Sequence, residues 1–266
     1  MVRTLIVAGK RRKKVLMKVL FSSDLHGDMD AYQSFSRLLH KHDCGVLAGD
    51  LLDEFLPISD AKRYGLFNDS EPEELHDENF DEVAELELKI DDALKNPESI
   101  NRKGLEKKRQ EICEILSYAQ KPIYYVIGNH DIANWIDYKM VKNLQGKRIQ
   151  IGEFSIYGID TKYKGIYGTF KYSRSLKKEV DDKTILVSHI PPHGILDHTD
   201  RDGSIGSKEV LKLIKKAKPL YCLFGHVHEE FGIKENMING SWFLSRKFIS
   251  LDLGKNEISI LDPEKS

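Results

Sequence analysis

Cysteine is scarce in this 266-residue chain, which contains only Cys44, Cys113 and Cys222. The three are far apart, odd in number and never arranged as Cys-x-x-Cys, so neither a disulfide framework nor a cysteine-based zinc site is predicted. Free thiols of this kind are typical of reducing compartments. We therefore expect a cytoplasmic protein.

Neither sign of charge dominates, and no long apolar run occurs. The chain has 41 Lys and Arg residues against 42 Asp and Glu residues, for a formal net charge of −1. Nucleic-acid-binding surfaces are typically basic, so a nucleic-acid partner, and a DNA nuclease activity in particular, is not favoured. A membrane span needs roughly 20 consecutive apolar residues, and the sequence has no such stretch. We expect neither a membrane nor a nucleic acid as partner.

The first residues, MVRTLIVAGKRRKK, place a short apolar segment before a basic run. The apolar segment, Leu5 to Ala8, is shorter than the roughly 7–15 residues of a signal-peptide core, and the charges lie on its wrong side. We interpret residues 1–16 as a basic, solvated tail rather than a binding patch. An alternative is that natural synthesis starts at Met17, because MKVLFSSDLHGD forms a complete first strand and loop.

Five short apolar runs end in side chains that can bind metals. Each run has the length and the polar or glycine boundaries of a buried sheet strand. Sites in α/β sheets gather beyond the carboxyl ends of the strands, so these five endings predict one shared site. The runs are KVLMKVLFSS before Asp24, CGVLAG before Asp50, PIYYVIG before Asn129, KTILVS before His189 and PLYCLFG before His226.

Helical and alternating patterns lie around these runs. Residues 31–40 and 207–217 carry apolar residues three and four apart, which predicts helices. The later segments FSIYGI, FISLDL and EISIL alternate and predict strands of a second sheet or hairpins. Because no repeat or low-complexity linker interrupts the chain, we expect one domain at residues 17–262.

A segment at about residues 57–120 differs from the rest. Residues 69–92 hold twelve acidic residues against one lysine. Two amphipathic stripes, one before and one after Pro97, predict a helical-hairpin insertion. Packing of two solvated helices on the body is the favoured interpretation. A cap over the site, or a surface for a homo-oligomer, are the alternatives.

Two pairs of candidate ligands are spaced two residues apart, Asp24 with His26 and His226 with His228. In an extended backbone that spacing points both side chains the same way, unlike the i, i+4 spacing of helical zinc motifs. Imidazole, carboxylate and amide donors together suit borderline divalent metals such as Mn²⁺, Fe²⁺/Fe³⁺ or Zn²⁺.

A carboxylate with two oxygens can bridge two such cations and offset their repulsion. Two metals roughly 3.5–4 Å apart activate a bridging hydroxide and stabilise both the attacking and the leaving oxygen of an in-line displacement. The ligand set therefore predicts hydrolysis of a phosphate ester with two divalent metal ions as cofactors.

The ordered motifs D-x-H, G-D-x-x-D, G-N-H-D, H and G-H-x-H resemble those of the calcineurin-like metallophosphoesterase superfamily, from about Val15 to Leu253. The resemblance implies an α/β/β/α sandwich of two packed mixed sheets flanked by helices, with a two-metal centre at one sheet edge. The predicted helical insertion is the least typical part.

The resemblance also implies a role for each motif residue. The first metal would be held by Asp24, His26 and His228, Asp50 would bridge, and the second would be held by Asn129, His189 and His226. His130 would contact the phosphate and protonate the leaving group, oriented by Asp53, so Asn129 and His130 are also expected substrate contacts. For Asp131, a helix cap or a supporting role and direct catalysis both stay open.

Departures from the family bear on the substrate. Protein phosphatases of this superfamily follow G-D-x-x-D with Arg-Gly, where this chain has Glu54-Phe55, so a protein phosphatase is not favoured. The segments HIPPHGILDHTD and FGHVHEEFG are similar to small phosphodiesterase-type members, including the brain metallophosphoesterase-domain group. We expect a phosphodiesterase that acts on a small nucleotide-like substrate. A phosphomonoesterase of the same fold and a non-enzymatic scaffold are the alternatives.

Several other residues carry weaker expectations. His193 is expected in loop structure, with a substrate contact as the alternative. The segment KYKGIYGTFKYSRS, residues 162–175, is expected to be a mobile surface loop, although its aromatic and basic residues could stack a base and bind phosphate. Trp135 and Trp242 are expected in packing, with Trp135 also close enough to line a pocket. Four further histidines are expected on the surface, namely His40, His42, His76 and His198.

Overall fold

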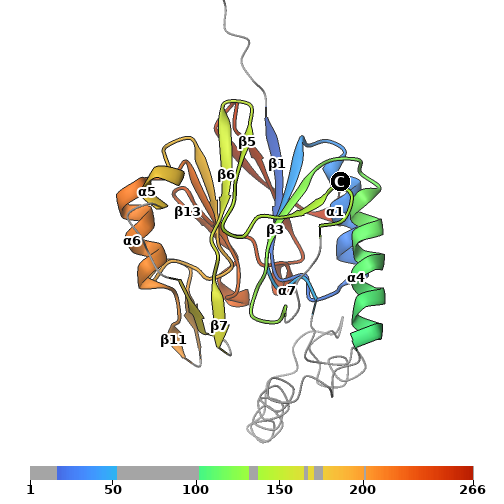
Figure 1. The fold of residues 1–266 in the computed structure, drawn as a ribbon, viewed down its shortest axis with the longest axis horizontal. Coiled ribbons are helices and arrows are strands. Elements are labelled where there is room, and N and C mark those ends of the chain that lie inside the picture. Colours follow the sequence, from blue (N-terminus) through green and yellow to red (C-terminus); the bar gives the residue numbers. More distant parts are fainter. Residues whose placement is uncertain are drawn as a thin grey trace, which may run out of the picture.

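The computed structural model describes residues 17–52, 102–131, 137–164, 167–170, 176–200 and 202–265. Two sheets of six strands each pack face to face, and helices cover both outer faces (Figure 1). The predicted α/β/β/α sandwich is confirmed. The basic N-terminal tail, residues 1–16, and most of the predicted insertion, residues 53–101, lie outside the described residues.

The first sheet has the strand order β16-β15-β1-β2-β3-β4. The strands β1 to β4 are parallel to one another, and the hairpin of β15 and β16 pairs antiparallel with β1 at the edge of the sheet. In this register Leu47 of β2 lies between Ser22 and Tyr125. The strands are β1 (Lys18–Ser22), β2 (Cys44–Ala48), β3 (Ile123–Val126), β4 (Val141–Asn143), β15 (Phe248–Asp252) and β16 (Glu257–Leu261).

The second sheet has the order β13-β14-β12-β9-β6-β5. Its four central strands are parallel, and β5 and β13 pair antiparallel at the two edges. The strands are β5 (Arg148–Ile151), β6 (Phe154–Gly158), β9 (Thr184–Val187), β12 (Tyr221–Phe224), β13 (Gly232–Lys234) and β14 (Met237–Asn239). The alternating segments expected as second-sheet strands or hairpins are thus β6, β15 and β16.

The helices divide between the two outer faces. Figure 1 shows α1 (Met29–Leu39) and α4 (Arg102–Ser117) outside the first sheet, and α5 (Leu176–Glu179) and α6 (Lys208–Ala217) outside the second. The side chains of Asp28 and Ser207 cap the first turns of α1 and α6 by accepting bonds from backbone N–H groups. The described residues also form the short helix α7 (Trp242–Ser245) and the 3₁₀ turns η3 (His228–Glu230) and η4 (Pro263–Lys265).

Two small hairpins project from the sandwich. They are β7 (Lys162–Lys164) with β8 (Tyr167–Thr169), and β10 (His198–Thr199) with β11 (Gly203–Ser204). Figure 1 shows β7 and β11 extending from the side of the sandwich on which α7 lies. A regular hairpin thus occupies part of residues 162–175, where a mobile loop was expected.

Alternation along each strand builds three apolar layers. In β1, Val19 and Phe21 belong to the core between the sheets, whereas Leu20 packs under α1. In β12, Leu223 faces the central core and Phe224 faces the layer under α6. Because both faces of these strands are covered, the sequence shows continuous apolar runs in place of alternation.

Three predictions away from the ligand motifs can be checked in the described residues. Helix α4 forms where the second insertion helix was expected, and its Ile112 and Leu116 pack in the layer that it shares with α1. Trp242 is buried and stacks on Phe248 at a centroid distance of 4.4 Å, as expected of a packing residue. The prediction for His42 is wrong, because its side chain is buried, at 5% exposure.

His42 is buried because both of its ring nitrogens have partners. Nδ1 lies 2.8 Å from the Leu38 carbonyl oxygen and Nε2 lies 2.8 Å from Ser250 Oγ, which joins the end of α1 to β15. His40 and His198 are exposed as expected. His76 and Trp135 lie outside the described residues.

A search of the described residues for a helix that is long and apolar enough to cross a membrane gives none.

Candidate metal centre

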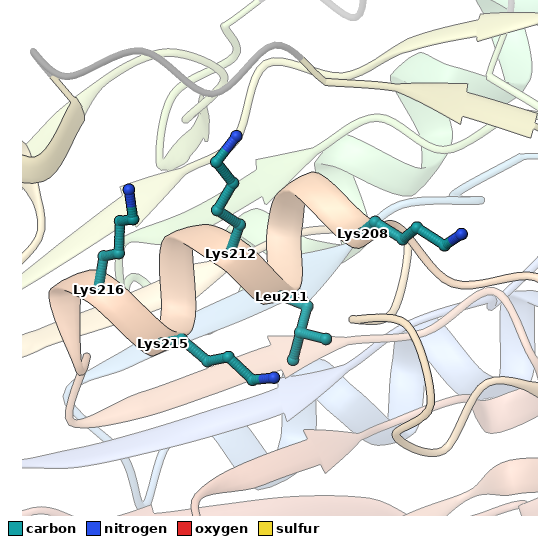
Figure 2. Close-up of a pocket in the computed structure, with 5 residues that line it drawn as sticks. All are labelled: Lys208, Leu211, Lys212, Lys215 and Lys216. Carbon is teal, nitrogen blue, oxygen red and sulfur yellow. The ribbon is translucent and has the colours of Figure 1, made fainter.

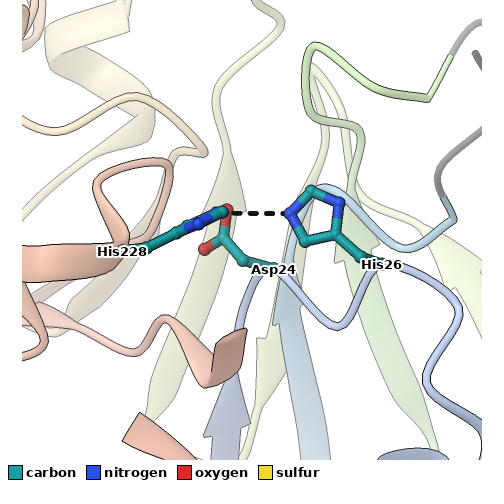
Figure 3. A group of neighbouring side chains, drawn as sticks. All are labelled: Asp24, His26 and His228. Atoms are coloured by element: carbon teal, nitrogen blue, oxygen red, sulfur yellow. Dashed lines mark hydrogen bonds and ion pairs between the residues drawn. The ribbon is translucent and has the colours of Figure 1, made fainter. Parts of the chain in front are cut away.

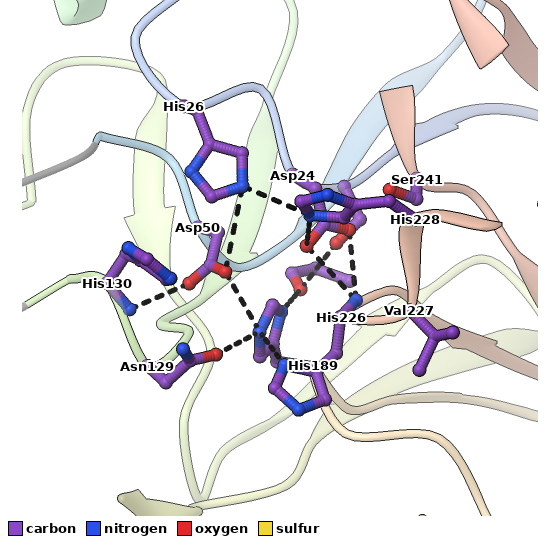
Figure 4. Close-up of polar contacts among 12 residues, drawn as sticks. Asp24, His26, Asp50, Asn129, His130, His189, His226, Val227, His228 and Ser241 are labelled. Carbon is purple, nitrogen blue, oxygen red and sulfur yellow. Dashed lines mark hydrogen bonds and ion pairs between the residues drawn. The ribbon is translucent and has the colours of Figure 1, made fainter. Parts of the chain in front are cut away.

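The two sheets are joined at the edge where the five ligand-bearing strands end. Ser23, just after β1, donates its N–H to the Gly240 carbonyl at 2.9 Å and accepts the N–H of Trp242 at 2.9 Å. Its hydroxyl donates to the Ala48 carbonyl at the end of β2, at 2.8 Å. These bonds bring the ends of β1, β2 and β14 together, and the predicted ligands gather there (Figure 4).

One group of candidate ligands consists of Asp24, His26 and His228, as shown in Figure 3. His26 Nε2 lies 3.2 Å from His228 Nε2, and His228 Nε2 lies 3.5 Å from Asp24 Oδ1. Asp24 and His26 follow β1, whereas His228 begins η3, about 200 residues later in the chain. Asp24 and His26 are buried, and the His228 side chain is 26% exposed.

A second group consists of Asp50, His189 and His226. His189 Nε2 lies 3.3 Å from Asp50 Oδ2 and 3.2 Å from His226 Nδ1. Asn129 adds its side-chain oxygen, 2.9 Å from His189 Nε2. Four strand ends, those of β2, β3, β9 and β12, therefore supply this group.

Asp50 lies between the two groups. Its Oδ2 is 3.3 Å from His189 Nε2 and 3.9 Å from His26 Nε2, one imidazole from each group. Its Oδ1 accepts the backbone N–H of His130 at 2.9 Å, and the His130 ring meets the His26 ring edge-on at a centroid distance of 5.1 Å. Asp50 is thus within 4 Å of one imidazole from each group, and His130 lies next to it.

The backbone is strained where it carries ligands. Four ligand residues have positive φ angles, at 55° for Asp24, 44° for His26, 48° for Asp50 and 74° for His226. The left-handed region is unfavourable for residues other than glycine, and such outliers cluster at functional sites. The ends of β1, β2 and β12 are therefore held in a costly conformation where they carry these candidate ligands.

Glycine is required where the loops approach these carboxylates. A Cβ on Gly128 would lie 2.1 Å from Asp50 Oδ1, and one on Gly225 would lie 2.1 Å from Asp24 Oδ2. No side chain fits in either place without displacing a ligand. The glycine before Asn129 and the glycine before His226 thus allow the close packing of the centre.

For Asp24, Asp50 and His189, burial shifts the pKa in one direction and the neighbouring charged groups shift it in the other. Burial raises the pKa of Asp24 and Asp50, but the His228 hydrogen bond lowers that of Asp24 to about 2, and the charge of His189 lowers that of Asp50 well below its usual range. Burial lowers the pKa of His189, but Asp50 outweighs it and raises the value to about 9. Burial and the charge of His189 lower the pKa of His226 to about 3. The two anionic carboxylates and the neutral His226 thus have the protonation that a metal requires, and a metal would displace the proton of His189.

The donor set fits a cation. His189 Nδ1 lies 2.7 Å from the Ala48 carbonyl oxygen, so its N–H donates there, and Nε2, which the raised pKa protonates when it binds no metal, faces Asn129 Oδ1 and Asp50 Oδ2. Three acceptors that converge in this way are satisfied only by a cation, either a proton or a metal. In addition, His226 Nε2 is buried with no hydrogen-bond partner among the described residues. The two groups, with Asp50 of the second only 3.9 Å from His26 of the first, fit a dinuclear divalent centre.

Two buried polar residues support the ligand loops. Asp131 accepts the N–H groups of Leu51 at 3.0 Å, Leu52 at 3.1 Å and Gly128 at 2.8 Å, and so ties the loop after β2 to the loop after β3. Of the roles left open for Asp131, the structure favours the supporting one. Asn239 donates to the Val227 carbonyl at 2.8 Å, between His226 and His228.

Sequence reasoning missed Asn239, and it gave Phe243 and Tyr163 no individual role. The Phe243 ring lies beside His228 and His26. The Tyr163 hydroxyl donates to the Ile127 carbonyl at 3.1 Å, and its ring lies 5.9 Å from that of His189. No motif marks these residues, because their contacts depend on how the loops fold back.

The described contacts place one predicted site residue, His193, away from the centre, and a second cannot be compared. Asp53 lies outside the described residues. His193 Nδ1 lies 3.0 Å from Ser204 Oγ and 3.8 Å from Asp197 Oδ2, so it belongs to the loop around the β10–β11 hairpin. That is the loop role that the sequence favoured for His193.

A shallow surface depression on α6 is a separate feature. It is lined by four lysines and one leucine, which point outward from the helix (Figure 2). The depression contains none of the candidate ligands and belongs to the outer helical layer, so we assign it no part in the chemistry. The five residues are Lys208, Leu211, Lys212, Lys215 and Lys216.

Comparison with known proteins gives one family and several structural relatives. The model of the calcineurin-like phosphoesterase family matches residues 17–230. UPF0046 protein K07C11.7 of Caenorhabditis elegans is 31% identical over 104 residues, which are 36% of this chain and 34% of that protein. The match therefore spans about a third of the relative's length.

Two solved structures share the fold. A dimetal phosphatase from Danio rerio is 11% identical with a TM-score of 0.58, over 92% of this chain and 95% of that one. The protein TT1561 of Thermus thermophilus is 16% identical with a TM-score of 0.54, over 94% of this chain and 100% of that one. At such low identity, these likenesses establish the fold alone.

Proposed function

The chain belongs to the calcineurin-like phosphoesterase family, and we propose that it is a phosphodiesterase that uses two divalent metals to hydrolyse a small, nucleotide-like phosphodiester. Membership makes it a phosphoester hydrolase by class. Beyond this class, the proposal states that the enzyme prefers a diester, that each candidate ligand has a particular role, and that manganese supports the reaction.

The observation that carries the proposal is the position of Asp50, which belongs to one group of three candidate ligands and also lies 3.9 Å from His26 of the other. We assign Asp24, His26 and His228 to one metal, Asn129, His189 and His226 to the other, and Asp50 to both. Two bound divalent metals would supply an activated water nucleophile and would neutralise charge on the phosphate oxygens.

The side chains around the ligands supply the remaining steps. The His130 ring lies beside that of His26, and the backbone N–H of His130 donates to Asp50 Oδ1. These two contacts hold the imidazole next to the candidate ligands. We assign it the transfer of a proton to the leaving oxygen, a contribution of about 10²–10⁴-fold in rate for a well-placed acid. Asn129 is assigned a contact with the phosphate as well as the metal.

The test is hydrolysis by protein stripped of metal with a chelator and then supplied with Mn²⁺. Bis-(p-nitrophenyl) phosphate and p-nitrophenyl phosphate are compared for the unmodified protein, Asp50→Asn and His130→Ala. Manganese-dependent cleavage of the diester should fall at least about 100-fold in either variant. Asp182→Asn, an exposed aspartate before β9, is the matched control and should keep full activity.

Other outcomes would redirect the assignment. A preference for the monoester would make the protein a phosphomonoesterase. Absence of hydrolysis of both esters, with two metals bound per chain, would favour a scaffold built on the same fold. Full activity in Asp50→Asn would remove the shared carboxylate from the mechanism.

A further inference from the structure

Phe243 is an aromatic side chain at the metal centre that neither binds metal nor transfers a proton. Its ring centroid lies 4.7 Å from that of His228, with an angle of 34° between the planes, and 5.5 Å from that of His26, at 77°. The residue is only half-buried. Part of an aromatic surface is therefore open to solvent beside a polar centre, where it forgoes hydrophobic stabilisation.

The short helix that carries Phe243 is fixed to the ligand loop after β1. Asp28, two residues after His26, accepts the indole N–H of Trp242 at 3.1 Å and forms an ion pair with Arg246. The Trp242 N–H also donates to the Ser23 carbonyl at 2.9 Å. Because both ends of α7 are tied down, the Phe243 ring is a preorganised surface, and a preorganised surface loses little entropy when a ligand packs on it.

The position of the ring relative to His130 indicates which part of a substrate it meets. Figure 4 shows His130 and His228 on opposite sides of Asp50. Phe243 lies against His228, whereas His130 is the group to which we assign protonation of the leaving oxygen. A diester held between them would direct its leaving group toward His130 and its retained substituent toward Phe243.

We propose that Phe243 is a specificity-determining residue that packs against a planar aromatic ring on the substituent that the phosphorus retains. A nucleobase or a phenyl group has such a face, and a short alkyl group has none. This inference rests on the proposed function, and it narrows the substrate class to aryl or nucleoside phosphodiesters.

The kinetic test uses two diesters with the same leaving group. Phenyl p-nitrophenyl phosphate and methyl p-nitrophenyl phosphate both release p-nitrophenolate, so they differ only in the retained substituent. Phe243→Leu should raise KM about fivefold for the phenyl diester and leave that for the methyl diester within about twofold, since one aromatic contact is lost. Phe243→Tyr, which keeps the ring, should restore the phenyl value. Leu244→Ala, beside it on α7 and 60% exposed, is the control and should change neither.

An equilibrium measurement separates this inference from the proposed function. Titration calorimetry of the manganese-loaded protein with phenyl phosphate and methyl phosphate should show tighter binding of phenyl phosphate, and Phe243→Leu should abolish the difference. Equal losses for both ligands, with reduced manganese content, would make Phe243 a residue that only positions His26 and His228. Equal affinities in the unmodified protein would overturn the inference even if the diesters are cleaved. A phenyl preference without cleavage would contradict only the proposed function.

Discussion

Two buried histidines, His42 and His226, show how the interior of this protein differs from the sheet edge that carries the candidate ligands, here called the ligand edge. His42 has partners for both ring nitrogens, the Leu38 carbonyl and the Ser250 hydroxyl, each at 2.8 Å. His226 points Nδ1 at another imidazole nitrogen, 3.2 Å away, and its Nε2 has no partner among the described residues. Buried polar groups are normally paired. The pairing identifies His42 as structural, whereas His226, whose Nδ1 meets another imidazole and whose Nε2 is unpaired among the described residues, is a candidate ligand.

The backbone shows the same contrast. His42 follows α1, a capped helix whose apolar face is fully packed. His226 has a φ angle of 74° and follows a glycine against which Asp24 is packed. Strain of this kind costs about 1–3 kcal/mol per residue. The ligand edge therefore gives up stability that the interior retains.

The largest effect is expected on hydrolysis when His226 is removed, and the comparison variant removes His42. His226→Ala should lower manganese-dependent hydrolysis at least about 100-fold, beyond the 10- to 100-fold typical of a residue that only supports a ligand. His42→Ala should leave hydrolysis within about twofold but lower the free energy of unfolding by about 1–3 kcal/mol, because two buried partners lose their hydrogen bonds. Activity assays and urea unfolding in the presence of a chelator measure the two effects.

The two variants act as controls for each other. With chelator present, His226→Ala should lose less stability than His42→Ala, since it leaves one partner behind, His189 Nε2, whereas His42→Ala leaves two. The comparison breaks if His226→Ala costs as much stability as His42→Ala and still binds two manganese ions.

A smaller effect is expected from Asn239, which supports the loop between two ligands. Asn239→Ala removes the bond to the Val227 carbonyl and the bond from the Ser241 N–H. Manganese affinity should fall about 10- to 100-fold, because His226 and His228 lose their fixed loop. Manganese titration followed by calorimetry measures the change.

Asn236→Ala is the matched variant for this prediction. Asn236 also donates its amide to backbone carbonyls, those of Pro219 and Leu220, but does so in the turn between β13 and β14. It should lower stability without changing manganese affinity. Equal losses of affinity in the two variants would show that general loosening of the second sheet, and not the ligand loop, is responsible.

Most of the fold could be predicted because the strands are covered on both faces. Continuous apolar runs such as KTILVS mark β9 without ambiguity, and each run ends at a polar residue. His42 was misplaced because its burial depends on a contact with Ser250, more than 200 residues away. A single polar residue after a helix carries no local signal of such a contact.

The candidate ligands could be named from the sequence because each follows a strand end within a short motif. Their supporting residues could not. Asn239 is the last residue of the three-residue strand β14, whose sequence contains no metal-binding motif. Phe243 lies in a four-residue helix. Both act through loops that meet only when the two sheets pack, so spacing along the chain does not reveal them.

The smallest effect concerns the pH dependence that His42 contributes. Burial, followed by the nearby charge of Lys18, lowers the pKa of His42 below its usual 6.5. The unfolded chain therefore takes up a proton at a higher pH than the folded protein does. Stability due to this group is fully present above pH 6.5 and is lost as the pH falls from there toward the lower folded pKa. Urea unfolding at a series of pH values across that window measures it.

His42→Gln should flatten that part of the curve, because the amide does not titrate. The other histidines, His226 and His189 included, titrate in both proteins, so they cancel in the difference between the two curves. A difference that does not change with pH would mean that His42 takes up its proton equally well when folded. An advantage of the unmodified protein over His42→Gln that shrinks as the pH rises would reverse the sign. It would require a charge partner that stabilises protonated His42, which would remove the contrast between a paired, neutral interior histidine and the charged ligand edge.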